Sequence, residues 1–388
     1  MKILQAFSFF SVSSGGGTVD FVYKVSRALR KRGHEVTIYT SDFKLDQKYI
    51  DSLQRVKVFP FQSLIDLPGL HITPGLISEA AKNLKNFDVI HLHSQRSFQN
   101  IILHHYAQRY NIPYVLDTHG STPLEHKKTF KLLFDILYGN KICKDCSKFI
   151  AETQMGINEY KEIGVPDDKI ALIPPPFPIE DFANLPPSGQ FHKEYNIKEK
   201  HIIMFFGRLN RIKGIDFLVE SFYELTQQRD DVILAIVGPD DGFKSELEHL
   251  VNKLKLSNKV LFTGFLGGEQ KLAALVGADI VVQTSRYEQG AWAPFEAVLC
   301  GTPIIVSSHT GAGEDVRRLD AGYLVEIDNK RELAETINNI LEDPTEARQK
   351  AQNAAKYIRE NLSMNKKIED YERVYIECIE GDISKEGR

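Results

Sequence analysis

The sequence predicts an α/β protein with two doubly wound domains, each a mainly parallel sheet with helices on both faces. Short apolar runs alternate with longer amphipathic segments along the whole chain, which is typical of βαβ units. A proline-rich break interrupts this alternation near the middle, and the alternation restarts after it. The length of 388 residues also suits two domains better than one.

The first domain is expected over residues 1–175. It opens with an apolar strand at 2–7, followed by a glycine loop and an amphipathic helix over 18–32 with its apolar positions on one face. The runs EVTIYT, VKVF, DVIHLH and PYVLDT have the composition of further strands. The opening apolar run is short and broken by polar residues, so we interpret it as a strand rather than a signal peptide.

Residues 176–199 are expected to form a linker. Six of the chain's 16 prolines lie between Pro174 and Pro187, a density that excludes helix and central strand. The second domain follows over 200–360, and a charged helical stretch over 361–388 could pack back on the first domain. Because ligands of doubly wound sheets bind beyond the carboxyl ends of the strands, we expect the active site in a cleft between the two domains.

Composition excludes several classes of protein. A net charge of −4 and a pI near 6.3 argue against a nucleic-acid-binding protein. Four cysteines in 388 residues are too few for a disulfide framework, so the reducing cytoplasm is the expected location. No run of 18 apolar residues occurs, so no transmembrane helix is expected.

The most informative segment is SRYEQGAWAPFEAVLCGTP, in which Glu288 and Glu296 lie eight positions apart. Glu288 is in a loop of small residues, and Glu296 follows Pro294 at the start of a short helix that Gly301 would end. Carboxylates here are suited to accepting hydrogen bonds from sugar and ribose hydroxyls, while nearby backbone amides suit phosphate. The segment therefore favours a ligand that is part sugar and part diphosphate.

Two further segments supply phosphate-binding candidates. Arg208 and Lys213 follow a strand directly and are five positions apart, so together they can neutralise a diphosphate. Gly15, Gly16 and Gly17 join the first strand to the first helix, where glycine permits close approach of a ligand to the backbone. The alternatives are a solvated loop for the cations and a plain tight turn for the glycines.

Three histidines follow or lie in strands of the first domain. His119, at the end of PYVLDT and before Gly120, can reach into the predicted cleft, although it could equally be a structural histidine. His91 and His93 alternate along one strand, and we expect them to point to opposite faces and not to share a metal ion.

Residues 127–148 combine lysines with large apolar side chains. This mixture is typical of a helix on an anionic bilayer surface, and it also fits an ordinary domain helix with a charged face. The sequence therefore leaves peripheral contact with the inner membrane surface open.

Taken together, these motifs resemble those of the retaining glycosyltransferases of family 4, also called group 1, which have the GT-B fold. The resemblance covers nearly the whole chain and is clearest from about residue 202 to 325. The family signature E-x7-E matches Glu288 and Glu296, and its other elements match Gly207, Arg208, Lys213 and Gly214, the glycines 15–17, and His119 with Gly120. The chain departs from the family after Glu288, where Gln289, Gly290, Ala291 and Trp292 replace the common G-F-G.

The resemblance implies a role for each of these residues. It assigns Arg208 and Lys213 to the donor diphosphate, Glu296 to the ribose and Glu288 to the donor sugar, and it places His119 beside the transferred sugar. The implied catalytic set is His119, Arg208, Lys213 and Glu288. The implied donor-binding set is Gly15, Gly16, Gly17, Arg208, Lys213, Gly290, Ala291, Trp292 and Glu296. The family needs no metal ion or other cofactor, and this chain has no Asp-x-Asp motif.

The expected function is transfer of a sugar from a nucleotide sugar to a saccharide, lipid-linked or other small acceptor, with retention of the anomeric configuration. A nucleotide-sugar epimerase of the same architecture and a non-catalytic nucleotide-sugar-binding protein are the alternatives. A Rossmann dehydrogenase lacks support, because neither strand-to-helix turn carries the dinucleotide fingerprint.

Overall fold

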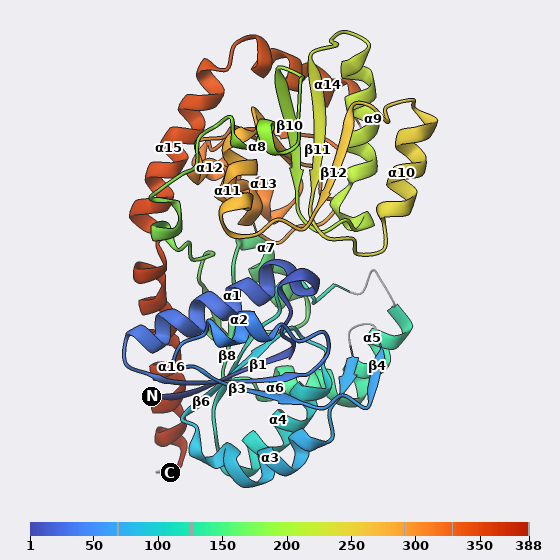
Figure 1. The fold of residues 1–388 in the computed structure, drawn as a ribbon. Helices are drawn as coiled ribbons and strands as arrows, with labels where there is room; N and C mark the ends of the chain where they lie inside the picture. The colour runs from blue at the N-terminus through green and yellow to red at the C-terminus, as the bar shows by residue number, and fades with distance from the viewer. Residues whose placement is uncertain (68–69, 124–127, 291, 328, 387–388) are drawn as a thin grey trace. The chain divides into compact units, whose positions relative to one another are not determined.

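The structure, a computed structural model, describes residues 1–67, 70–123, 128–290, 292–327 and 329–386. The chain divides into unit 1, which contains Met1–Pro176 and Met364–Arg388, and unit 2, which contains Phe177–Ser363. Each unit has a parallel sheet with helices on both faces (Figure 1). The predicted fold class is therefore confirmed.

Unit 1 is built on a seven-stranded parallel sheet in the order β3-β2-β1-β6-β7-β8-β9. Its strands are β1 (Lys2–Phe9), β2 (Glu35–Ser41), β3 (Lys57–Phe61), β6 (Val89–His93), β7 (Tyr114–Asp117), β8 (Lys148–Ala151) and β9 (Ile170–Leu172). A separate antiparallel pair contains β4 (Ile65–Leu67) and β5 (Leu70–Ile72). The helices are α1 (Val12–Lys31), α2 (Gln47–Asp51), α3 (Gly75–Asn83), α4 (Phe98–Tyr110), α5 (Lys128–Phe134), the π-helical η2 (Asp135–Gly139), α6 (Asn140–Asp145), α7 (Gln154–Glu162) and α16 (Met364–Glu386).

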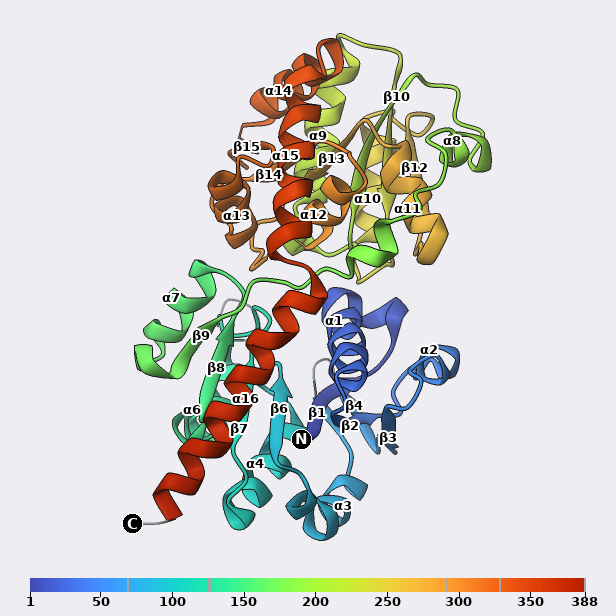
Figure 2. The same cartoon turned by 90° about the vertical axis from the view of Figure 1, so that its left-hand side faces the viewer.

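The two faces of this sheet are covered differently. Helices α3, α4, α6 and α7 pack on one face through a cluster of buried apolar side chains. Helix α16 lies along β6 and β7 on the other face and also contacts α1 (Figure 2). That second face carries polar side chains, among them Gln5 and His91, which bond to Tyr375 of α16.

Unit 2 is built on a six-stranded parallel sheet in the order β12-β11-β10-β13-β14-β15. Its strands are β10 (His201–Phe206), β11 (Val232–Val237), β12 (Val260–Gly264), β13 (Ile280–Gln283), β14 (Ile304–Ser307) and β15 (Tyr323–Val325). Its helices are α8 (Gln190–Glu194), α9 (Ile215–Thr226), α10 (Lys244–Lys253), α11 (Gly268–Gly277), α12 (Trp292–Leu299), α13 (Gly311–Leu319), α14 (Lys330–Glu342) and α15 (Thr345–Asn361).

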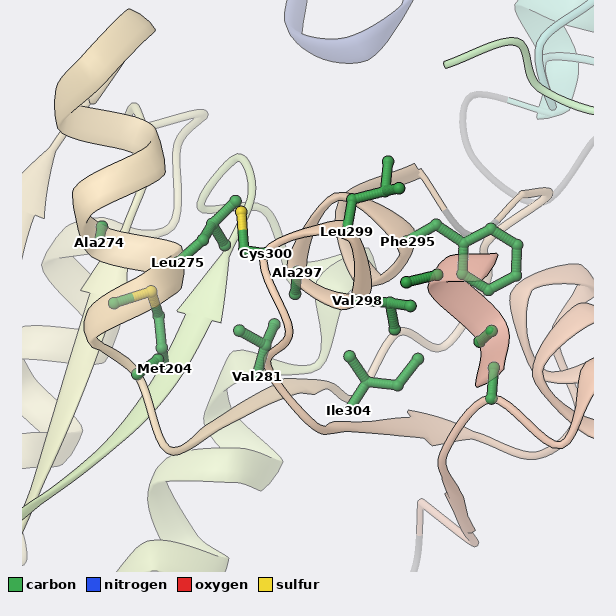
Figure 3. Packing of buried hydrophobic residues seen from close by; sticks show 14 of the residues in the cluster. Met204, Ala274, Leu275, Val281, Phe295, Ala297, Val298, Leu299, Cys300 and Ile304 are labelled. Atoms are coloured by element: carbon green, nitrogen blue, oxygen red, sulfur yellow. The ribbon is translucent and has the colours of Figure 1, made fainter. Parts of the chain in front are cut away.

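Alternation along the strands of unit 2 creates two cores. In β10, Met204 packs with α11 and α12 on one face, whereas Phe205 packs with α9 and α14 on the other. Figure 3 shows the first core, where Val281 and Ile304 of neighbouring strands lie beneath Ala297 and Val298 of α12. Helix α12 carries Glu296, so this packing sets where that carboxylate emerges.

The boundary between the two units falls within the proline-rich segment, because Pro174–Pro176 belong to unit 1 and the residues from Phe177 onward belong to unit 2. Phe177, Phe182 and Phe191 are buried in the core of that unit, and the Phe177 N–H donates to the carbonyl of Leu362 at 2.8 Å. Prolines prevent regular backbone hydrogen bonding but do not prevent aromatic side chains between them from packing. Within the predicted linker over 176–199, the residues from Phe177 onward therefore pack with unit 2.

Candidate active site

The candidate donor site lies where the strand order of unit 2 reverses. Strands β10 and β13 are neighbours although three helices and two strands separate them in sequence, and such a switch point is where doubly wound sheets bind ligands. The segment after β10 carries Arg208 and Lys213, and the segment after β13 carries Glu288. The topology therefore places these two segments at one edge of one sheet.

Gly214 allows the two segments to touch. Its φ is +62°, and a Cβ at this position would lie 1.9 Å from the carbonyl oxygen of Thr284. The Thr284 hydroxyl donates to the Gly214 carbonyl at 2.9 Å. Glycine is therefore required here for both conformation and space.

Lys213 and Glu288 form an ion pair at this edge. The same oxygen of Glu288 also accepts hydrogen bonds from Gln283 Nε2 at 2.6 Å and Ser285 Oγ at 3.2 Å. The Glu288 carbonyl accepts from Gly311 N at 2.9 Å, where α13 begins. Hydrogen bonds thus hold both the side chain and the backbone of Glu288. The side chains of Lys213 and Glu288 are each about one-fifth exposed.

Arg208 has a different partner. Its Nη1 lies 2.8 Å from Asp241 Oδ2, which also accepts from Asn210 Nδ2 at 3.0 Å, and the Arg208 side chain is 42% exposed. Ion pairs at this exposure contribute about 0–1 kcal/mol, so a diphosphate could replace Asp241 at low cost. The nearby Arg211 pairs with Glu246 and lies over the ring of Phe243.

Glu296 is buried in α12 and forms an ion pair with Lys271 of α11. Lys271 was not among the site residues predicted from the sequence. Lys271 Nζ lies 2.8 Å from Glu296 Oε1 and 6.0 Å from the ring centroid of Phe182. No motif links two residues on separate helices, so the only sequence signal was a lysine directly before the apolar second half of α11.

The segment between the two glutamates differs from the expectation in one respect. Helix α12 begins at Trp292, two residues before Pro294, and the Trp292 ring packs against Phe177 at 5.3 Å between centroids. Gly290 is buried just before it, and Ala291 lies outside the described residues. The indole of Trp292 thus belongs partly to the core of unit 2.

In unit 1 the glycine segment is not an open loop. Helix α1 begins at Val12 rather than at residue 18 and includes Gly15 and Gly17. Gly16 interrupts the helical conformation with φ +57° and ψ −145°, a combination available to glycine. The prediction of a loop over these residues was therefore wrong, because the helix forms on both sides of a single glycine kink.

His119 follows β7 with φ +46° and is almost fully buried. Its Nδ1 lies 3.1 Å from Glu152 Oε1 and 3.3 Å from Asp117 Oδ1, and its Nε2 lies 2.9 Å from His93 Nδ1. The backbone N–H of His119 also donates a hydrogen bond to Asp117 Oδ1 at 3.0 Å. Ring and backbone are both held within unit 1.

The prediction that His91 and His93 point to opposite faces was wrong. Their ring centroids lie 4.0 Å apart, because positions two apart in a strand project to the same face. Burial lowers the pKa of both rings well below the ordinary value of a histidine. They are therefore neutral, and each has a hydrogen-bond partner, Tyr375 for His91 and Gln5 for His93.

The part of the chain that the structure describes thus contains two candidate groups. Unit 2 holds cations and carboxylates at a switch point, a composition suited to a diphosphate linked to hydroxyl-rich groups. Unit 1 holds a buried histidine cluster at the carboxyl edge of its own sheet. None of the described helices has the length and hydropathy needed to cross a membrane.

Comparisons with known proteins agree with this composition. Residues 188–358 match the model of the glycosyl transferases group 1, and residues 15–181 match that of glycosyltransferase family 4. N-acetyl-alpha-D-glucosaminyl L-malate synthase from Bacillus anthracis is 24% identical over 390 residues, covering 98% of this chain and 99% of the relative.

Solved structures show the same fold. HepE from Anabaena, determined with UDP and glucose, superposes with a TM-score of 0.81 at 20% identity and covers 96% of this chain and 98% of its own. WaaG, a glycosyltransferase involved in lipopolysaccharide biosynthesis, has a TM-score of 0.73 at 14% identity and covers 95% of this chain and 98% of its own. At these identities the likeness concerns the fold.

Proposed function

The chain belongs to the group 1 glycosyltransferases and uses a nucleotide-sugar donor, and from this premise we propose that it transfers the sugar with retention of the anomeric configuration and without a metal ion. The observation that supports donor binding in unit 2 is the contact between Lys213 and Glu288 at the switch point of its sheet. A phosphate-binding cation and a hydroxyl-binding carboxylate in contact suit the junction between a diphosphate and a sugar.

We propose the following roles in unit 2. Lys213 and Arg208 neutralise the diphosphate, Glu288 accepts hydrogen bonds from the donor sugar, and Glu296 accepts those of the ribose. An ammonium group has three N–H donors, so Lys213 can bond Glu288 and a phosphate oxygen together. The carboxylate would then align the sugar while the ammonium stabilises the leaving group.

The proposed reaction breaks the bond between the anomeric carbon and the phosphate oxygen, and the electron pair stays on the diphosphate. The acceptor hydroxyl attacks the same face of the sugar and gives its proton to that phosphate oxygen. Positive charge at Arg208 and Lys213 stabilises the departing diphosphate, which is the largest electrostatic demand of the step. No step requires a metal ion.

Two measurements test this proposal. Thermal denaturation with a panel of nucleoside diphosphates and their sugars should show one donor that stabilises the protein by about 2.7 kcal/mol at a hundred times its Kd. With that donor and candidate acceptors, NMR of the product should show the donor's anomeric configuration, and EDTA should leave the rate unchanged. An inverted product would reject retention, and loss of rate with EDTA would reject metal independence.

We also propose that unit 1 contacts an anionic membrane surface through α5 and η2, which lie at its periphery (Figure 1). Six large apolar side chains in this short segment are 44–64% exposed: Phe130, Leu132, Leu133, Ile136, Leu137 and Tyr138. The exposed charged residues from 129 to 145 are Lys141 and Lys144, whereas Asp135 pairs with Arg96 and Asp145 with His104. Exposed apolar side chains beside exposed lysines suit an anionic bilayer.

Cosedimentation with phosphatidylglycerol vesicles tests this contact. We expect binding at low salt that weakens at high salt, and little binding to phosphatidylcholine. Replacing Ile136 and Leu137 with Ser should abolish it, whereas Ile163→Ser, at an apolar residue that is 44% exposed after α7, should not. No binding of the native chain at low salt would reject the proposal.

A further inference from the structure

The His119 ring uses both of its nitrogens inside unit 1. Nδ1 faces the carboxylates of Glu152 and Asp117 at 3.1 and 3.3 Å, and Nε2 faces His93 Nδ1 at 2.9 Å. The planes of the His93 and His119 rings differ by only 13°. A short nitrogen–nitrogen distance between nearly parallel rings is the geometry of a hydrogen bond in the ring plane, so one of the two nitrogens must donate.

The neighbour of His93 decides which nitrogen donates. His93 Nε2 lies 2.6 Å from Gln5 Oε1, a carbonyl oxygen that can only accept. His93 Nε2 therefore carries the proton, and in a neutral ring Nδ1 is then an acceptor. His119 must donate to it from Nε2, while His119 Nδ1 donates to the carboxylate of Glu152. A ring that donates from both nitrogens is an imidazolium.

We propose that His119 is a fixed imidazolium and that Glu152 and His93 are positioning residues that hold its charge and orientation. Neither ring nitrogen then remains to transfer a proton or to bond a sugar hydroxyl. His119 acts instead as a permanent positive charge at the carboxyl edge of the unit 1 sheet. Its catalytic meaning, a positive charge beside the transferred sugar as the family resemblance implies for this residue, rests on the proposed function.

The groups around His119 are consistent with a single cation. Burial by itself lowers the pKa of His119, but Asp117 and Glu152 outweigh it and raise that pKa above the ordinary value. Burial, together with Glu152, raises the pKa of Asp117 to about 7, so both carboxylates contribute to holding the charge of His119, and Glu152 also accepts its Nδ1 hydrogen bond. From the elements packed nearby, His91 is neutral because burial lowers its pKa.

The remaining titratable neighbours are tyrosines of α7 and α16. Burial raises the pKa of Tyr160, Tyr371 and Tyr375, so all three stay neutral phenols over the pH range of an assay. Tyr160 donates to the Ile150 carbonyl and lies 3.0 Å from the Thr118 hydroxyl, beside the turn that carries His119. Because the tyrosines are neutral, the charged groups of the cluster are His119 and the two carboxylates.

NMR of the full chain labelled with ¹⁵N-histidine tests the assignment without any substrate. Multiple-bond ¹H–¹⁵N spectra distinguish imidazolium from the two neutral tautomers, and a His119→Gln sample identifies the His119 signals. We expect both His119 nitrogens to be protonated at pH 7.5, about one unit above the ordinary pKa of a histidine. The exposed His105 supplies a surface reference in the same spectrum.

Two spectral outcomes would overturn the assignment. A single protonated nitrogen on His119 at pH 7.5 would mean that His93 donates, with the Gln5 amide reversed. Loss of the Nδ1 proton on addition of Zn²⁺ would assign Asp117, His119 and Glu152 to a metal site, since their ligand atoms lie within 4.8 Å of one another.

Kinetics of Glu152→Gln and Glu152→Asp test the positioning role. In Glu152→Gln we expect the pKa of His119 to fall, because one of its two carboxylate neighbours is lost, and kcat to fall about tenfold, with the donor KM within about twofold. Glu152→Asp should restore the pKa of His119 and part of kcat. A neutral His119 with unchanged kcat would overturn the catalytic role. An inactive native enzyme that shows the imidazolium would instead overturn the proposed function alone.

Discussion

The candidate groups of the two units contrast in exposure and in freedom to exchange partners. In unit 2 the side chains of Lys213 and Arg208 are 18% and 42% exposed, and each has one carboxylate partner. In unit 1 the His119 ring is 6% exposed and its two nitrogens are held by side chains from the neighbouring strands β6 and β7 and the segment after β8. Both groups lie at the carboxyl edge of a parallel sheet.

The difference indicates two ways of placing positive charge. Long side chains near solvent can leave a carboxylate and bind a phosphate, because surface ion pairs contribute little. A buried imidazolium cannot exchange its partners without leaving a charge unpaired in the interior, which is costly. Unit 2 is therefore suited to exchanging its carboxylate partners for a charged ligand, whereas the proposed imidazolium of unit 1 keeps its partners and its charge.

Removing a cation from unit 2 should have the largest effect on activity. In Lys213→Ala or Arg208→Ala we expect turnover to fall about a hundredfold or more, as when one electrostatic donor to a transition state is lost. Steady-state kinetics with the donor found by the thermal panel measures this. The matched control is Arg211→Ala, since Arg211 lies between the two but pairs with Glu246.

Arg211→Ala should keep turnover within about threefold, the range of a lost surface ion pair. Equal losses in all three variants would indicate a general field of positive charge rather than two specific contacts. A Lys213→Ala, Arg208→Ala double variant with near-native turnover would contradict the assignment of the donor site to the β10–β13 edge.

Substituting the glycine that joins the two segments should have the next largest effect. Gly214→Ala must adopt a positive φ and place a Cβ 1.9 Å from the Thr284 oxygen, so we expect a loss of about 2–3 kcal/mol in the free energy of unfolding. Gly242→Ala is the control, because Gly242 has φ +86° but no atom within 4 Å of a Cβ. It should cost about 1–2 kcal/mol, the conformational part alone.

Urea denaturation of both variants gives these values. If the close approach to Thr284 sets the Lys213–Glu288 contact, Gly214→Ala should also weaken donor binding, and Gly242→Ala should not. Identical losses of stability in the two variants would mean that the segments are free to move apart, which contradicts the packing of the site.

The sequence was sufficient for the fold and for part of the site. Apolar alternation predicted both sheets, and spacing placed Glu288 and Lys213 after strands that the topology makes neighbours. The same reasoning could not find Lys271 or Asp241, because each comes from a different loop or helix and no fixed spacing links it to its partner. Partners across a sheet edge depend on strand order, which local pattern does not supply.

The errors in unit 1 have other causes. The shared face of His91 and His93 follows from the two-residue period of a strand and could have been predicted. The kink at Gly16 could not, because glycines permit a loop and a broken helix equally well. Glu152 was not singled out, since a lone acid after a strand has no signal until β8 is known to lie beside β7.

The stability of unit 1 should depend on pH through its buried histidines. Burial lowers the pKa of His91 and His93, and burial raises that of Asp117 to about 7. The carboxylates outweigh burial and raise the pKa of His119. A histidine whose pKa is lowered in the native state reduces the free energy of unfolding as pH falls below the unfolded value of about 6.5. A group whose pKa is raised in the native state reduces the free energy of unfolding as pH rises.

Between about pH 5 and 6.5 the unfolded chain binds protons on His91 and His93 that the native chain lacks, while native Asp117 keeps one that the unfolded chain lacks. The net difference of one proton gives a free energy of unfolding that rises by about 1.4 kcal/mol per pH unit. Above about pH 6.5 the native chain retains a proton on His119 that the unfolded chain loses, and native Asp117 remains partly protonated until about pH 7, so stability should fall again.

Urea denaturation from pH 5 to 8 should therefore show a maximum near pH 6.5 for the transition that includes unit 1. Glu152→Gln should weaken the fall above the maximum, because it removes one of the two carboxylates that keep His119 charged. Stability that keeps rising through pH 8 in the native chain would contradict a buried imidazolium. The contrast between the two units would then reduce to exposure alone, since the charge of unit 1 would no longer be permanent.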